Sequence, residues 1–161
     1  MRRGLTASGV VVGSVNGSAA VWTPNGSGSY TLTLLDARYA NGIDANATMM
    51  VGERAPHSGS GAVYWVASGG GWGNAISFPG NCEASRDIAD AGNRATLNNC
   101  PFGGSTTYAA FIDAPFTTPM KLGGVGGHDN NFVGGISPSG TYMVGYGFTS
   151  GSVQVGVYWR P

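Results

Sequence analysis

The sequence predicts an all-β, propeller-like fold, and three observations support that class. Glycine and proline are frequent, with 29 Gly and 8 Pro among 161 residues, and both disfavour long helices. A short pattern made of a branched apolar residue, a tight turn and an apolar run recurs four times. The later strands of the pattern are apolar on both faces, as expected for sheets stacked between neighbouring sheets. Another stacked or sandwich-like β fold is the alternative.

The four turns divide the chain into units the size of a propeller blade. Their first residues are 38, 45 and 48 residues apart, close to the length of a four-stranded blade, and they are Leu5, Ile43, Ile88 and Ile136. We therefore expect a single repeat domain with units at residues 1–35, 36–79, 80–122 and 123–161.

Each turn is expected to join the first two strands of a blade as a hairpin. A residue with positive φ is needed near the end of such a turn, and three of the four turns have glycine there: Gly9, Gly92 and Gly140. The second turn has Ala47 at this place, so we expect the neighbouring Asn46 to adopt the left-handed conformation.

The third strand of each unit has its own signature. A small residue is followed three positions later by tryptophan in three units, at Trp22, Trp65 and Trp159. The third unit has Asp113 at that position, and we expect Phe111, two residues earlier on the same strand face, to fill the space.

A fourth strand is expected at residues 30–35, 75–78 and 119–122, whereas the last unit stops in its third strand. The last blade should therefore be incomplete. The chain would then form a closed four-bladed ring, part of a seven- or eight-bladed ring, or an oligomer that completes the ring.

The two cysteines are expected to form a disulfide. Cys82 lies just before the first strand of the third unit, and Cys100 lies at the end of the second strand. The midpoint between them falls inside the hairpin turn, so the two residues should face each other across the hairpin. Closing the 17 intervening residues would stabilise the fold by roughly 3 kcal/mol in the loop-entropy description.

The composition excludes several classes of function. Lys plus Arg and Asp plus Glu number 8 each, so the net charge is zero and no basic stripe for nucleic acid is expected. No run of about 20 apolar residues is present, so we expect no membrane insertion. The chain contains no spacing typical of a zinc site, a P-loop or a nucleophile elbow, so we expect no metal and no cofactor.

The composition also bears on location. Residues 1–5 lack the apolar core of a signal peptide, yet the chain is rich in Gly, Ser and Asn and its single lysine is Lys121. We expect an extracellular, periplasmic or cell-surface protein whose export signal is not part of this sequence. A cytosolic protein is the alternative.

The repeats resemble the extracellular HAF repeat family. Its units have an I-N-x-x-G-x-V-V-G-x-S turn and strand followed by H-A-F-x-W, and the first motif is similar to residues 5–14, 43–52 and 136–145 here. Ala62-Val63-Tyr64-Trp65 and Ala110-Phe111 resemble the second motif, and Lys121-Leu122-Gly123-Gly124 resembles the family's Leu-Gly-Gly lead-in. The family's histidine is missing from all four units. The resemblance implies an exported, propeller-like repeat protein and transfers no catalytic residue.

Charged residues are expected to gather at one end of the blades. In a four-stranded blade, the loop leading into the first strand and the loop joining the second and third strands lie at the same end. The charged residues and histidines expected there, which form the candidate binding face, are Asp36, Arg38, Glu53, Arg54, His57, Glu83, Arg86, His128 and Asp129. Simple solvation of polar loops is the alternative.

Trp72, in a glycine-rich loop, is a further candidate binding residue. Its ring would either stack on a sugar or a protein partner, or fold back over the edge of the blade.

We favour a secreted or surface-displayed binding module for a protein or polysaccharide, without catalytic residues. A carbohydrate-active hydrolase or lyase is the enzymatic alternative, in which Glu53 and either Glu83 or Asp129 would meet across the axis. A structural unit of an extracellular assembly is the third interpretation.

Overall fold

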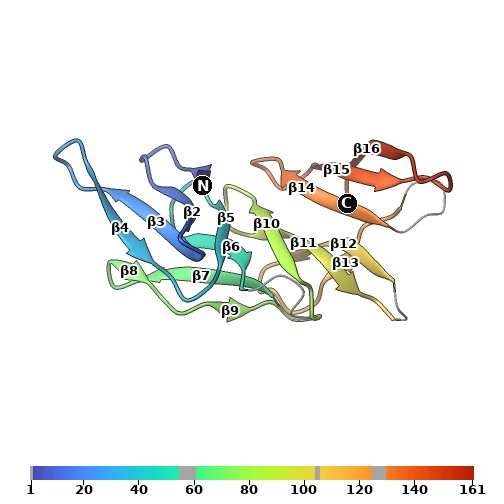
Figure 1. Cartoon of the computed structure of the whole chain (residues 1–161), viewed down its shortest axis with the longest axis horizontal. Coiled ribbons are helices and arrows are strands. Elements are labelled where there is room, and N and C mark those ends of the chain that lie inside the picture. The colour runs from blue at the N-terminus through green and yellow to red at the C-terminus, as the bar shows by residue number, and fades with distance from the viewer. Residues whose placement is uncertain (1, 55–60, 104–105, 125–129) are drawn as a thin grey trace.

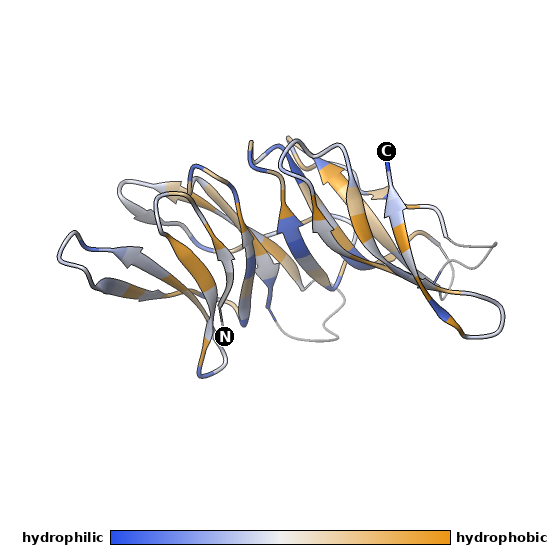
Figure 2. Cartoon of the chain, turned by 90° about the horizontal axis from the view of Figure 1, so that it is seen from above, coloured by the Kyte–Doolittle hydropathy of each residue, from blue (hydrophilic) through white to orange (hydrophobic). Residues whose placement is uncertain are grey.

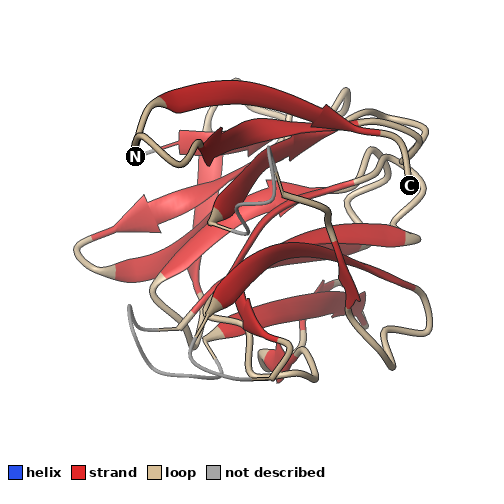
Figure 3. Ribbon diagram, turned by 90° about the vertical axis from the view of Figure 1, so that its right-hand side faces the viewer, coloured by secondary structure: helices blue, strands red, loops and turns tan. Residues whose placement is uncertain are grey.

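The computed structural model describes residues 2–54, 61–103, 106–124 and 130–161. The described chain forms antiparallel strands joined by loops, and none of it is helical (Figure 3). It therefore contains no helix long and apolar enough to cross a membrane. The strands form four successive sheets arranged in a row, with the first and the last at opposite ends (Figure 1).

Each sheet is built from strands that are consecutive in the chain. The first sheet has the order β1 (Arg2–Leu5), β2 (Val11–Val15), β3 (Ser18–Pro24), β4 (Tyr30–Leu34). The second has β5 (Tyr39–Ile43), β6 (Met49–Glu53), β7 (Ala62–Ser68), with β8 (Gly71–Trp72) and β9 (Ile76–Ser77) both pairing with β7. The third has β10 (Ala84–Ile88), β11 (Arg94–Pro101), β12 (Thr107–Asp113), β13 (Met120–Lys121). The fourth has β14 (Asn131–Ile136), β15 (Met143–Phe148), β16 (Gln154–Trp159).

This arrangement confirms the predicted all-β fold of meandering antiparallel blades. The expected fourth strands are present in the first three sheets as β4, β9 and β13, and the described part of the last sheet has three strands. The first strand of each later sheet packs against the preceding sheet: β5 against β1–β3, β10 against β5–β7, and β14 against β10–β12. Each first strand also contains a register shift, which bends it at the same point in every sheet.

Three apolar clusters fill the spaces between successive sheets. Val12 and Val21 of the first sheet meet Met50 and Trp65 of the second, and all four side chains are fully buried. A second cluster joins the second and third sheets, and a third joins the third and fourth. Burial of both faces explains why these strands are apolar throughout instead of alternating.

The second hairpin turn differs from the expectation. Ala47 itself takes the left-handed conformation, with φ of 54°, while Asn46 does not. The Asp44 carboxylate accepts hydrogen bonds from the backbone N–H of Thr48 and of Met49, each at 2.8 Å. These bonds fix the turn and impose positive φ on the residue that occupies the glycine position of the other turns.

The third repeat also differs, because its strand register is offset by one residue from the alignment expected. Ile112 pairs with Ala95 where Trp65 pairs with Met50 in the second sheet, so Ile112 occupies the tryptophan position. The expectation that Phe111 fills this space is wrong, since Phe111 lies on the opposite face and packs with the fourth sheet. Asp113 instead pairs with Arg94 at the strand end.

Candidate functional site

Three of the predicted binding residues converge on one small pocket where the second, third and fourth sheets meet. Glu53, Glu83 and Arg86 line this pocket, whose volume is about 130 Å³. Its other lining residues are Ala84, Asn98, Asn99 and Phe132. We call it the three-sheet pocket. It brings two carboxylates, one guanidinium, two amides and one phenyl ring into contact with a single opening.

Glu53 and Arg86 form an ion pair between adjacent sheets. Glu53 is the last residue of β6 and is buried, while Arg86 occupies the register shift of β10, where its side chain is about one-third exposed. The Arg86 Nη1 lies 3.4 Å from the Glu53 Oε2. The shift in β10 thus points a cation toward a carboxylate that the neighbouring sheet holds in place.

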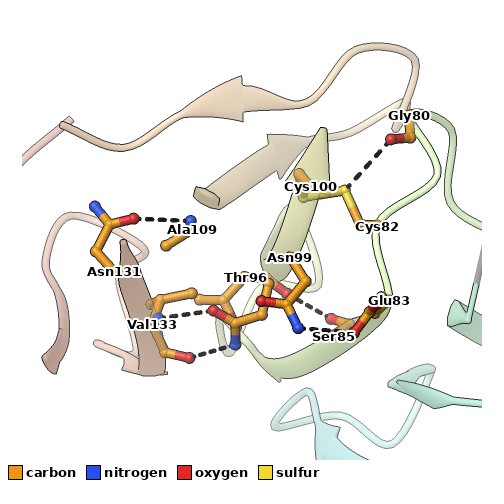
Figure 4. Close-up of a disulfide and its surroundings, with 11 residues drawn as sticks. Gly80, Cys82, Glu83, Ser85, Thr96, Asn99, Cys100, Ala109, Asn131 and Val133 are labelled. Atoms are coloured by element: carbon orange, nitrogen blue, oxygen red, sulfur yellow. Dashed lines mark hydrogen bonds between the residues drawn. A yellow bond between two sulfur atoms is a disulfide. The ribbon is translucent and has the colours of Figure 1, made fainter. Parts of the chain in front are cut away.

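Glu83 is positioned by the third sheet. Its Oε2 accepts a hydrogen bond of 2.7 Å from the Asn99 Nδ2 (Figure 4). The disulfide between Cys82 and Cys100 joins the residues immediately next to these two, with a Cα–Cα distance of 4.1 Å. The predicted disulfide is therefore present, and it ties together the two strand ends that carry one wall of the pocket.

Asn98 forms the base of the pocket and connects the third sheet to the fourth. Its amide donates to the Val133 carbonyl at 2.7 Å, and its Oδ1 accepts from the Val133 N–H at 2.8 Å. The side chain is buried and pairs with β14 as a neighbouring strand would. This contact places Phe132, the residue before Val133, at the rim of the pocket, where its ring stacks on Tyr146 at 5.1 Å between centroids.

Asp36, between β4 and β5, and Arg54, just after β6, both bond to the backbone of Ala75. Asp36 accepts hydrogen bonds from the Trp65 indole at 3.0 Å and from the Ala75 N–H, and Arg54 donates to the Ala75 carbonyl at 2.7 Å. Burial raises the pKa of Asp36, but these hydrogen bonds and the Arg54 charge together hold it below its ordinary value. Neither residue lines the three-sheet pocket.

The remaining predicted residues lie elsewhere. The Arg38 guanidinium packs over the Tyr39 ring, 5.2 Å from its centroid, and does not line the pocket. His57, His128 and Asp129 fall outside the described residues.

Trp72 lies at the opposite end of β7 from the three-sheet pocket. β8 pairs Trp72 with Ala67, near the end of β7, whereas Glu53 pairs with Ala62 at its start. The loop expected at this point is instead a tight hairpin, and the half-buried Trp72 ring packs against the cluster between the first two sheets. The ring borders an open groove of about 350 Å³, whose wall is the glycine run of residues 69–71.

Sequence reasoning missed four pocket residues: Asn98, Asn99, Ala84 and Phe132. The signal for the first two was present, because the third unit has two asparagines where the other units have a Val-Gly pair. Phe132 gave no signal of its own, since its place depends on how the fourth sheet docks.

A further carboxylate lies outside the pocket, between the first strands of three sheets. Asp87 occupies the β10 position that is glycine in β5 and β14, and its Oδ2 accepts from the Ile136 N–H at 3.1 Å. Burial raises the pKa of Asp87, and nearby Asp90 adds to the increase against the opposing hydrogen bonds from Ile136 and Ile88. Within the described residues, no group of three or more His, Cys, Asp or Glu side chains is placed to hold a metal ion.

Comparison with solved structures supports the propeller class. The chain superposes on TolB from Acinetobacter baumannii with a TM-score of 0.73 and 13% identity, covering 99% of this chain and 40% of that one. It superposes on a protein assigned as TolB from Agrobacterium tumefaciens with a TM-score of 0.68 and 12% identity, covering 99% of this chain and 57% of that one. No family profile and no curated protein matches the chain.

These likenesses concern the fold, which is that of a β-propeller. The chain spans 40% and 57% of the two proteins, so it corresponds to part of their length. The fold and the three-sheet pocket together define a propeller-like repeat protein with a small polar pocket where its blades meet.

Proposed function

We propose that the chain is a non-catalytic propeller module that binds a protein or polysaccharide through the three-sheet pocket. The observation that carries the proposal is the convergence of Glu53, Glu83 and Arg86, from two different sheets, on one opening. Binding residues are typically held on loops and strand ends by a rigid scaffold. Glu53 ends β6, Glu83 directly precedes β10, and Arg86 lies at the register shift inside β10.

The size of the pocket indicates the kind of ligand. Its volume of about 130 Å³ is below the roughly 300–1,000 Å³ of pockets that enclose whole small molecules. A pocket of this size accommodates one projecting group, such as a side chain or a single sugar unit, of a larger ligand. The rest of that ligand would lie across the surrounding surface.

The lining chemistry fits hydroxyl and amide groups. Carboxylate oxygens of Glu53 and Glu83 accept hydrogen bonds, the Arg86 guanidinium donates them, and the Phe132 ring supplies an apolar wall. Sugar rings combine hydroxyls with an apolar face, so a polysaccharide uses all of these groups, and an extended peptide uses most of them.

We also infer an extracellular or periplasmic location. The disulfide supports it, because such bonds persist in oxidising compartments. Membership of the HAF repeat family, which implies the same location, stays a prediction.

A direct binding experiment tests the proposed site. The chain would be titrated by calorimetry with dextran, mannan, polygalacturonate and chitosan oligosaccharides, and then with an array of extended peptides. For any probe that binds, Glu83→Gln and Phe132→Leu should each weaken binding about tenfold or more, because each removes one pocket contact. Arg160→Gln is the charge-removal control outside the pocket. Binding that is unchanged in both pocket variants would reject this site, and binding lost only in Trp72→Ala would place the ligand in the other groove.

A carbohydrate-active hydrolase or lyase is the second candidate, and one observation favours it: two glutamates line the same pocket. Released reducing ends from the same polysaccharides would be measured for the chain and for Glu53→Gln. Activity abolished by this substitution in a folded variant would replace the binding proposal with the enzymatic one.

A further inference from the structure

The row of sheets ends in two apolar faces that no other described sheet covers. At one end, the first-sheet outer face consists of Leu5, Trp22, Tyr30, Leu32 and Leu34. At the other end, the fourth-sheet outer face consists of Tyr142, Val144, Tyr146 and Tyr158. Apolar strand segments occur in the end sheets as well as in the middle of the row (Figure 2). Contiguous exposed apolar faces of this kind usually mark an interaction surface.

The fourth-sheet outer face is equivalent to surfaces that are buried inside the row. The cross-strand pairs Val12–Val21, Val51–Tyr64 and Val144–Tyr158 occupy the same place in the first, second and fourth sheets. Val12, Val21 and Val51 are fully buried against the next sheet, whereas Val144 is 55% exposed and Tyr158 is 74% exposed. The last sheet therefore presents the contact that the earlier sheets use to receive a following blade.

The first-sheet outer face is the complementary half of the same contact. Three paired residues of the first sheet are Leu5, Val11 and Trp22, and the equivalent residues of the second sheet are Ile43, Met50 and Trp65. The second-sheet residues pack against the first sheet. Ile43 is 9% exposed, and the equivalent Leu5 is 69% exposed. The first sheet thus presents the contact that later sheets use toward a preceding blade.

The tryptophan position shows what the first sheet lacks. The indole of Trp65 donates to Asp36, and the indole of Trp159 donates to the Gly123 carbonyl at 2.8 Å. Both acceptors lie in the segment that leads from the preceding sheet. In the described part of the chain, the Trp22 indole has no such acceptor.

We propose that two copies of this chain join head to tail into one closed ring of eight blades. The first-sheet outer face of each copy packs on the fourth-sheet outer face of the other. The occupant is a second copy because one chain carries both halves of the repeated contact. Two copies related by a two-fold axis therefore cover all four outer faces with the same kind of interface that already joins the sheets within a chain.

The chemistry of the faces fits this occupant. The outermost strands of the two end sheets, β4 and β16, contain no charged residue, so neither attracts a nucleic acid or an acidic surface. One face is mainly aliphatic with a tryptophan, and the other is mainly aromatic, so each would bury the exposed apolar side chains of the other.

Sedimentation velocity of the purified chain tests the proposal, with twice the monomer mass expected. Leu32→Glu and Tyr158→Lys should each weaken association by roughly 100-fold, because either places an unpaired charge in both interfaces. The double variant should recover dimer, because each interface then pairs one glutamate with one lysine. Val66→Glu, an exposed apolar residue on a middle sheet, is the matched control and should stay dimeric.

The other outcomes each count against the ring. A monomer at every concentration would indicate that the two faces are covered by other polypeptide. Masses that keep growing beyond the dimer would indicate an open head-to-tail chain in which the ring does not close. A dimer that persists in both single-charge variants, or a double variant that stays dissociated, would show that these two faces do not meet.

Discussion

The Asn98 side chain pairs with the backbone of Val133 through two hydrogen bonds, and so joins the third sheet to the fourth. Both groups of Val133 are used, and both residues are buried. The contact also sets the position of Phe132 at the rim of the three-sheet pocket. One amide therefore contributes to the docking of a blade and to the shape of the candidate site.

Asn98→Ala should destabilise the fold substantially. The substitution leaves the buried N–H and C=O of Val133 without partners, and the cost is about 2–3 kcal/mol. Urea unfolding followed by tryptophan fluorescence would measure it. Asn99→Gly is the control, because it removes only the bond to Glu83 and keeps the positive φ of 53° at that position. Equal destabilisation by the two variants would contradict the docking role of Asn98.

The sequence predicted the blades better than it predicted the site. Strand pairing depends on local turns and on apolar runs, which recur along the chain and can be compared with one another. The site depends on long-range docking: the sequence grouped Asp36 and Arg54 with the other candidate residues, whereas in the structure both bond to the Ala75 backbone and neither lines the three-sheet pocket. Phe132 reaches the pocket only through the way β14 packs, and no local pattern carries that information.

The register of the third repeat shows a second limit. Aligning the repeats by residue type placed Asp113 at the tryptophan position, whereas the backbone pairing places Ile112 there. A buried position between sheets excludes an unpaired carboxylate, so the strand is set with the aspartate at its end beside Arg94. The cost of burying a carboxylate therefore explains the pairing of β12 with β11, which comparison of residue types did not predict.

Ala47→Gly should stabilise the protein by about 0.5 kcal/mol. Ala47 has a φ of 54°, and an L-residue in this region carries a strain that glycine avoids, partly offset by the greater freedom of glycine in the unfolded chain. The thermal midpoint should rise by a few degrees. The reverse change at the equivalent place in the fourth sheet, Gly140→Ala, should destabilise, because φ is 75° and the new Cβ would lie 3.4 Å from that of Ala89. A lower midpoint for Ala47→Gly would argue against strain in this turn.

The disulfide should stabilise both the third sheet and the pocket. Replacing Cys82 and Cys100 by serine should lower the free energy of unfolding by roughly 3 kcal/mol, since the bond closes a loop between residues 18 apart. Urea unfolding of the variant and of the chemically reduced chain should agree. Binding of any probe that the pocket recognises should also weaken, because Glu83 and Asn99 lie next to the two cysteines. An unfolding midpoint that does not change on reduction would exclude this stabilising role.

Two aspartates should give the protein opposite responses to acid. Hydrogen bonds hold the pKa of Asp36 below its ordinary 3.8 despite burial, so its contribution is present above about pH 4 and is lost as the pH falls through the lowered value. Burial raises the pKa of Asp87, so the folded state binds a proton more readily than the unfolded chain. The ionised carboxylate therefore lowers the free energy of unfolding at neutral pH, and this penalty disappears as the pH falls toward 3.8.

Unfolding free energies at pH 7, 5, 4 and 3 would separate the effects of Asp36 and Asp87. Asp36→Asn should lower the free energy of unfolding at pH 7 and flatten its decrease below pH 4. Asp87→Asn should change the free energy of unfolding, relative to the unsubstituted chain, more favourably at pH 7 than at pH 4. If Asp87→Asn left the pH profile between 7 and 4 unchanged, a raised pKa at Asp87 would be excluded.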